Sequence, residues 1–224
     1  MGAADTVFLL DVDNTLIDND AIQAELSTHL EATFGAACRD RYWAIFEELR
    51  AGLGYADYLG ALQKYRLETD SDHQLLLMSS FLIDYPFARR LYPGAFAAIR
   101  HCQERGPTAI LSDGDVVFQP RKIERSGLWR GLNGKVLVYV HKELALASVE
   151  RLFPARRYVM VDDKLRILAA MKQVWDKRLT TVFVRQGHYA HSAAETANYP
   201  PADLTIETIG DLRALDLARL GGRE

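Results

Sequence analysis

The sequence contains few cysteines, no long apolar run and no strong excess of one charge. Cys38 and Cys102 are its only cysteines, and their wide separation favours a reducing compartment over a disulfide scaffold. The longest apolar segment, residues 75–83, is too short to span a bilayer, and the N-terminus lacks the regions of a signal peptide. A net charge of -3 gives no overall attraction to nucleic acid. We therefore expect a cytoplasmic protein that binds neither nucleic acid nor membranes.

The chain is long enough to fold around a substantial apolar core. It has 224 residues, of which 49% are hydrophobic and 25% are charged, so we expect one large domain or a core with an insertion. Short apolar runs alternate with segments of helical spacing, and the runs predict strands at residues 6–10, 108–111, 136–140, 158–161, 181–184 and 204–206. This alternation favours an α/β fold, with a doubly wound parallel sheet that carries helices on both faces.

One segment departs from this alternation. Between Leu16 and Arg90 we predict no strand, because apolar residues recur at helical spacing in four stretches, residues 22–34, 42–49, 58–65 and 75–83. Turn-forming residues around Gly35, at residues 52–54 and at residues 69–72 separate these stretches. The segment therefore predicts an all-helical insertion in the sheet.

Polar side chains follow four of the predicted strands, at the point where each strand ends. Because the carboxyl ends of parallel strands lie along one edge of a sheet, we expect these residues to meet in one pocket. Two aspartates placed that close repel each other, so the pocket needs a proton or a cation between them. The residues, in strand order, are Asp11 and Asp13, then Ser112, then Lys142, then Asp162 and Asp163.

These groups, in this order, resemble the motifs of the haloacid dehalogenase superfamily of phosphohydrolases. Asp11-x-Asp13-x-Thr15 is similar to the first motif, and Ser112, Lys142 and the pair Asp162-Asp163 are similar to the second, third and fourth. The resemblance implies a Rossmann-like core formed by residues 1–16 and 91–224, and a helical cap formed by residues 17–90.

The resemblance also implies a role for each motif residue. Asp11 is expected to be the nucleophile and Asp13 the general acid/base, while Ser112 and Lys142 hold the phosphoryl group. Magnesium is expected to bind Asp11, the main-chain carbonyl of Asp13, Asp162 and Asp163, directly or through water. Independently of the family, an all-oxygen set of carboxylates beside a phosphate suits Mg²⁺.

We therefore expect a Mg²⁺-dependent phosphomonoesterase that acts on a small organic phosphate through an aspartyl-phosphate. A phosphomutase needs the same residues and a cap that excludes water, so it stays open as an alternative. A 2-haloacid dehalogenase needs neither an acid/base at Asp13 nor a metal. A receiver-like signalling domain, which uses a similar residue set, takes its acceptor aspartate from a later strand and has no long helical insertion.

Several assignments stay open in the sequence. Lys122 is a rival for the role of Lys142, and either member of the pair Asp162-Asp163 could contact the metal directly, with Asp163 preferred. Asn14 occupies a position where the family often has glycine. His188 and His191 are expected in a loop and not as ligands. The cap residues that could reach a substrate are Arg41, Tyr42, Tyr55 and Tyr58.

Overall fold

The computed structural model describes residues 4–68 and 72–217. Most of the turn predicted at residues 69–72, and both ends of the predicted core, lie outside these residues. Within the described residues, every helix is too short or too polar to cross a bilayer.

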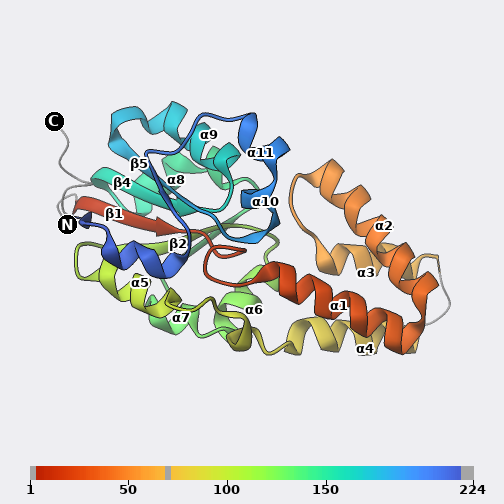
Figure 1. Ribbon diagram of the computed structural model, residues 1–224. Coiled ribbons are helices and arrows are strands. Elements are labelled where there is room, and N and C mark those ends of the chain that lie inside the picture. Colours follow the sequence, from red (N-terminus) through yellow and green to blue (C-terminus); the bar gives the residue numbers. More distant parts are fainter. Residues whose placement is uncertain (1–3, 69–71, 218–224) are drawn as a thin grey trace.

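Six parallel strands form a single sheet in the described part of the chain (Figure 1). Their order is β3-β2-β1-β4-β5-β6, so β1 lies near the centre, between β2 and β4. The predicted fold class and all six predicted strands are confirmed. β4 starts three residues earlier than predicted because its first residues pair in register with the start of β1. The strands are β1 (Ala4–Leu10), β2 (Thr108–Asp113), β3 (Val136–Tyr139), β4 (Ala155–Asp162), β5 (Leu179–Val184) and β6 (Leu204–Ile206).

Helices cover both faces of the sheet, and β1 illustrates how its residues are divided between them. Phe8 and Leu10 pack into one apolar cluster, whereas Val7 and Leu9 pack into the other, because side chains alternate along a strand. The first cluster includes residues from α5 (Ala95–Gln103), α6 (Phe118–Arg125), α7 (Leu128–Gly131) and the 3-10 helix η4 (Ile209–Ala214). The second includes residues from α8 (Leu146–Leu152), α9 (Leu165–Trp175) and α10 (Gly187–His191).

The remaining short elements connect the strands to these helices. They are the 3-10 helices η1 (Phe87–Arg90), η2 (Lys142–Leu144) and η3 (Asp176–Arg178), and α11 (Ala193–Ala197). The segment that carries His188 and His191 is α10 and not the predicted loop, and Gly187 supplies the positive φ with which it begins.

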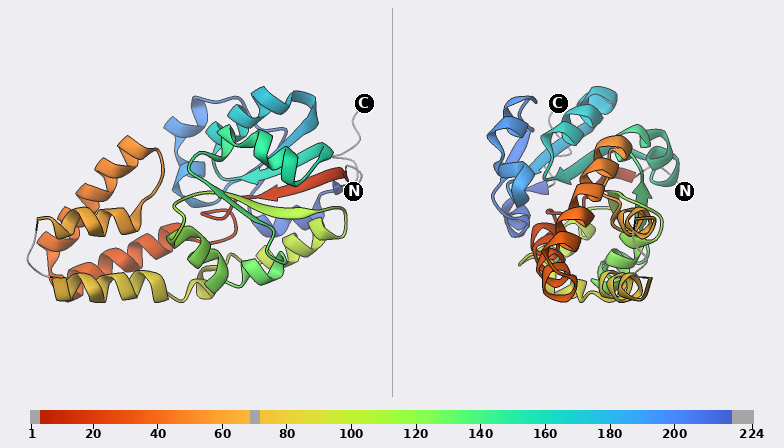
Figure 2. Two further views of the ribbon diagram at one scale, coloured as in Figure 1. Left: turned by 180° about the vertical axis from the view of Figure 1, so that it is seen from behind. Right: turned by 90° about the vertical axis from the view of Figure 1, so that its right-hand side faces the viewer.

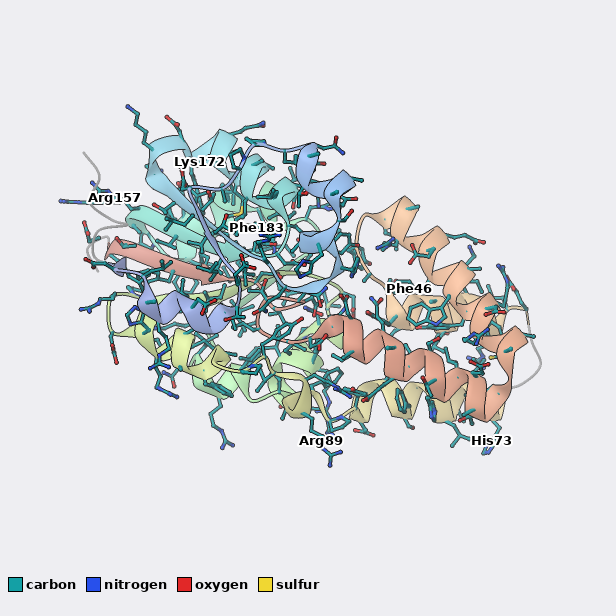
Figure 3. All side chains as sticks on the ribbon, viewed as in Figure 1. Phe46, His73, Arg89, Arg157, Lys172 and Phe183 are labelled. Carbon is teal, nitrogen blue, oxygen red and sulfur yellow. The ribbon has the colours of Figure 1, made fainter. Side chains whose placement is uncertain are left out.

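Four helices form the insertion between β1 and α5, as predicted. They are α1 (Asn19–Phe34), α2 (Ala36–Leu53), α3 (Tyr58–Arg66) and α4 (Asp72–Asp84). Figures 1 and 2 show them beyond the carboxyl ends of the strands, on the side toward which the arrow of β1 points. Phe46 lies between these helices (Figure 3), where its ring is 4.8 Å from that of Tyr58. We call helices α1–α4 the cap.

The chain enters and leaves the cap through two connectors that lie side by side. The amide of Asp18 donates to the carbonyl of Arg90 at 2.7 Å, and the amide of Tyr92 donates to the carbonyl of Leu16 at 2.9 Å. Ile17 and Leu91 also form an antiparallel bridge. The predicted boundaries at residues 16/17 and 90/91 therefore fall at this paired connection.

Candidate active site

The turn after β1 places two aspartates at the carboxyl edge of the sheet. The amide of Asp11 donates to the carbonyl of Val161, which ties the end of β1 to β4. The carbonyl of Val12 then accepts from Leu16 and Ile17, both at 2.9 Å, and closes a tight turn. The two aspartates then contact different lysines: Asp11 pairs with Lys142, and Asp13 pairs with Lys122.

Asn14 fits this turn because asparagine tolerates a positive φ, here 58°. Its Oδ1 accepts from the amides of Asn19 and Asp20 at 3.0 and 3.2 Å, so it satisfies two donors at the start of α1. A glycine could adopt the same backbone conformation but could not make these bonds. The departure from the family pattern at this position therefore has a structural role.

Lys142 joins two of the predicted carboxylates. Its Nζ lies 2.5 Å from Asp11 Oδ1 and 2.6 Å from Asp162 Oδ2, and the side chain is almost completely buried. Burial lowers the pKa of Lys142, but the neighbouring Asp11, Asp162 and Asp113 outweigh it and hold this pKa well above its ordinary value. Lys142 is therefore a buried positive charge just after β3, held between Asp11 and Asp162.

Asp11, Asp162 and Asp163 form a buried acidic group. One carboxylate oxygen from each lies within 4.8 Å of the others. Burial raises the pKa of Asp11 to about 6, an effect that Lys142 partly offsets. Burial also raises the pKa of Asp163 well above its ordinary value. Three carboxylates this close are unfavourable unless a proton or a cation neutralises them.

The hydrogen-bond partners of these carboxylate oxygens indicate whether a metal ion could bind among them. Both oxygens of Asp163 are buried without a hydrogen-bond partner, whereas Asp162 Oδ1 accepts from the amide of Lys164 at 2.9 Å. Buried acceptors without partners are costly, and a cation with oxygen ligands would satisfy them. The acidic group thus fits a divalent cation, and Asp163 is the best-placed direct ligand.

Asp13 lies outside this acidic group and binds residues of α6. Lys122 Nζ donates to Asp13 Oδ1 at 2.7 Å, and Gln119 Nε2 donates to Asp13 Oδ2 at 3.3 Å. The same Gln119 nitrogen donates to Ser112 Oγ at 2.9 Å. Lys122 and Lys142 are therefore not rivals for one position, because each pairs with a different aspartate. Gln119 was not predicted from the sequence. The spacing of three residues between Gln119 and Lys122, which places both on one face of a helix, could have identified it.

A cavity of about 420 Å³ opens between the cap and the sheet edge, beside Asp13 and Asp163. One side of it is held together by Arg50 of α2, which donates to the hydroxyl of Tyr189 of α10. Lys164 Nζ lies 4.8 Å above the ring of the same tyrosine. The cavity is also lined by Gln23, Phe46, Tyr55, Arg166, His188 and Tyr199, among others. Its lining is polar and mixed in charge, with three basic residues and three acidic ones, and it therefore suits a polar ligand: Arg50, Lys164 and Arg166, and Asp13, Asp163 and Glu195.

The four predicted cap residues have different surroundings. Only Tyr55 lines the cavity, and Tyr58 is buried behind it, where its hydroxyl accepts from Gln23 Nε2 at 2.9 Å. The prediction for Arg41 and Tyr42 is corrected. Arg41 pairs with Glu68 and Glu48 on the exposed side of the cap, and Tyr42 is buried in the cap interior.

Comparisons with known proteins agree with this fold. The family model for haloacid dehalogenase-like hydrolases matches residues 6–174, which is more than half of the chain. A search of curated proteins gave no match. The chain therefore belongs to the haloacid dehalogenase-like hydrolases and is an enzyme of that class, so the receiver-like alternative is set aside.

Solved structures give the same fold. A structure described as a haloacid dehalogenase-like hydrolase from Burkholderia xenovorans is 66% identical, with a TM-score of 0.92 over 95% of this chain and 99% of that chain. The L-2-haloacid dehalogenase from Xanthobacter autotrophicus is 19% identical, with a TM-score of 0.62 over 96% and 98%. The hydrolase YfnB from Bacillus subtilis, bound to magnesium, is 18% identical, with a TM-score of 0.63 over 95% and 98%.

Proposed function

We propose that this protein is a Mg²⁺-dependent phosphomonoesterase that acts through an aspartyl-phosphate on Asp11. The observation that carries the proposal is the buried group of Asp11, Asp162 and Asp163, in which both oxygens of Asp163 lack a partner. A phosphate ester is anionic, so it can approach this group only when a cation neutralises the carboxylates. Magnesium would be held by these three aspartates and would supply that neutralisation when bound.

In the proposed reaction, each side chain takes the role that the family resemblance implies for it. Asp11 attacks phosphorus in line, and the bond to the leaving oxygen breaks while Asp13 gives that oxygen a proton. Asp13 then removes a proton from a water molecule, and the resulting attack on the phosphoaspartate releases phosphate and restores Asp11. Lys142 and the hydroxyl of Ser112 stabilise the charge on the remaining phosphate oxygens.

Two features support hydrolysis of a phosphate over dehalogenation. Dehalogenation needs a nucleophile such as Asp11 but has no use for an acid/base at Asp13 or for a cation. In this chain Asp13 is held beside Ser112 through Gln119, and Asp163 offers two unpaired oxygens. The magnesium ion in the related hydrolase YfnB is consistent with this proposal.

The proposed substrate is a small organic phosphate. A cavity of about 420 Å³ accommodates a molecule of that size, and Arg50 and Lys164 add positive charge to its wall. Neither nucleic acid nor a membrane is proposed as a partner. A phosphomutase would use the same residues, and it is distinguished by a phosphorylated product in place of free phosphate.

The test is hydrolysis of p-nitrophenyl phosphate with Mg²⁺ and after chelation by EDTA. We expect Asp11→Asn to lower kcat by a factor of about 10³ or more, because the nucleophile is lost. Asp5→Asn is the matched control, since Asp5 is an exposed aspartate at the other end of β1. Activity that survives EDTA or Asp11→Asn would refute the proposal, and release of halide from 2-chloropropionate would favour dehalogenation.

A further inference from the structure

Lys122 is a buried cation to which the proposed reaction assigns no part. Its side chain is 0% exposed, and its Nζ donates to Asp13 Oδ1 at 2.7 Å and to Asn19 Oδ1 at 3.0 Å. The Nζ also lies 5.8 Å from the ring centre of Tyr58 and 5.3 Å from that of Phe118. Burial of an ammonium group is costly, and an apolar side chain would fill this space at a lower cost. A buried ammonium group at this position therefore indicates a functional role for Lys122.

The two oxygens of Asp13 are held unequally. Oδ1 receives a short, charge-assisted bond from Lys122, whereas Oδ2 receives only a 3.3 Å bond from the amide of Gln119. Gln119 has a second and shorter bond to Ser112 Oγ, at 2.9 Å, so its hold on Asp13 is the weaker of its two. Oδ1 is thus the anchored oxygen, and Oδ2 is the oxygen that can exchange a proton with substrate.

Lys122 also connects this carboxylate to the cap. Asn19, its second partner, begins α1, and Asn19 Nδ2 donates to the hydroxyl of Tyr58 in α3 at 3.3 Å. The ammonium group of Lys122 therefore lies between the acid/base residue of the core and two helices of the cap. Lys122 thus bonds to Asp13 and to Asn19 at the same time, so a residue of the cap takes part in the hold on Asp13.

From these contacts we infer that Lys122 is a positioning residue for Asp13, an inference that rests on the proposed function. Lys122 holds Oδ1, so that a proton on Oδ2 faces the leaving oxygen of the ester. As the bond between phosphorus and that oxygen breaks, the proton moves from Oδ2 to the leaving oxygen and Asp13 becomes a carboxylate. Lys122 keeps its bond to Oδ1 throughout and exchanges no proton with the substrate.

The inference is tested by Lys122→Met, which keeps the length of the side chain and suits the aromatic rings around it. p-Nitrophenolate leaves without a proton, whereas an alkoxide needs one, so loss of positioning affects alkyl esters most. We expect kcat/KM to fall roughly tenfold to a hundredfold more for glycerol 2-phosphate than for p-nitrophenyl phosphate. Lys135→Met, which removes an exposed lysine of the core, is expected to leave both values unchanged.

The results of these assays distinguish an error in the role of Lys122 from an error in the proposed function. If Lys122→Met lowers kcat/KM equally for the two esters, or for neither, Lys122 does not position the acid and the inference is wrong. If the wild-type protein hydrolyses neither ester, the proposed function itself fails. Should Lys122→Met be insoluble, Lys122→Gln removes the charge but keeps a hydrogen-bond donor, and the same comparison of the two esters then decides.

Discussion

At the scale of single residues, Asp163 is expected both to lower the stability of the metal-free protein and to bind Mg²⁺. Its oxygens are buried without partners beside two other carboxylates, so the metal-free protein bears the cost of this charge. We expect Asp163→Asn to raise the Tm of the metal-free protein at pH 7.5 by a few degrees, corresponding to about 1 kcal/mol. The same change should abolish the rise in Tm that Mg²⁺ gives the wild-type protein. Asp5→Asn is the control, and an unchanged response to Mg²⁺ in Asp163→Asn would contradict the assignment.

The stability of the metal-free protein is expected to fall as the pH rises. The folded-state pKa of Asp11 is raised from 3.8 to about 6, and burial also raises the pKa of Asp163 well above its ordinary value. A carboxyl whose pKa is raised on folding favours the folded state below its unfolded pKa, and this contribution is lost as pH rises through the folded pKa. Through Asp11, the metal-free protein should therefore lose stability between about pH 4 and 6, and the raised pKa of Asp163 adds a loss in the same direction. Mg²⁺ should raise Tm more at pH 7.5 than at pH 5, as thermal unfolding at the two pH values would measure.

At the scale of elements, the start of α10 supports the turn that carries Asp13. Gly187 has a φ of 70°, and a Cβ at this position would lie 2.4 Å from Asn14 Cβ. We expect Gly187→Ala to lower Tm and kcat together, because it combines backbone strain of about 1 kcal/mol with displacement of the turn. Gly35→Ala is a matched control: its φ is 87°, but nothing lies within 4 Å of the added Cβ. Equal losses of Tm in the two variants would mean that α10 does not support the turn.

The elements also show what could be predicted from the sequence. The first five strands were predictable because apolar runs of four to eight residues ending in polar residues are typical of buried parallel strands. Gln119 was not predicted, and Lys122 was predicted only as a rival of Lys142, because both reach the site from α6 and not from the end of a strand. In the cap, helical spacing identified the apolar stripe that contains Tyr42. It could not reveal that this stripe faces the cap interior and not the sheet, since that depends on how the four helices pack together.

At the scale of the whole molecule, the cap and the core share one apolar cluster. The rings of Tyr58 in the cap and Phe118 in the core lie 5.0 Å apart within it. The cavity lies beside this shared interior, and its wall is completed by polar contacts between the two parts. Asp20 at the start of α1 contacts His188 Nδ1 at 2.6 Å, and Arg50 of α2 contacts Tyr189. The position of the cap therefore depends partly on a few exposed or half-exposed bonds at the cavity rim.

The hydroxyl of Tyr189 is the most direct test of this dependence. Tyr189→Phe removes the acceptor of the Arg50 bond and keeps the ring below Lys164. A bond of this kind contributes about 1 kcal/mol, so its loss should weaken the closed arrangement by a factor of roughly five and raise KM by a similar factor, with little change in kcat. Tyr158→Phe removes a comparable hydroxyl bond, to the carbonyl of Phe153 at 2.8 Å, but within the core. It should lower Tm without changing KM. If Tyr189→Phe left KM unchanged, the Arg50–Tyr189 contact would have no part in closing the cavity, and the Asp20–His188 contact and the packing of Tyr58 on Phe118 would remain to hold the cap in place.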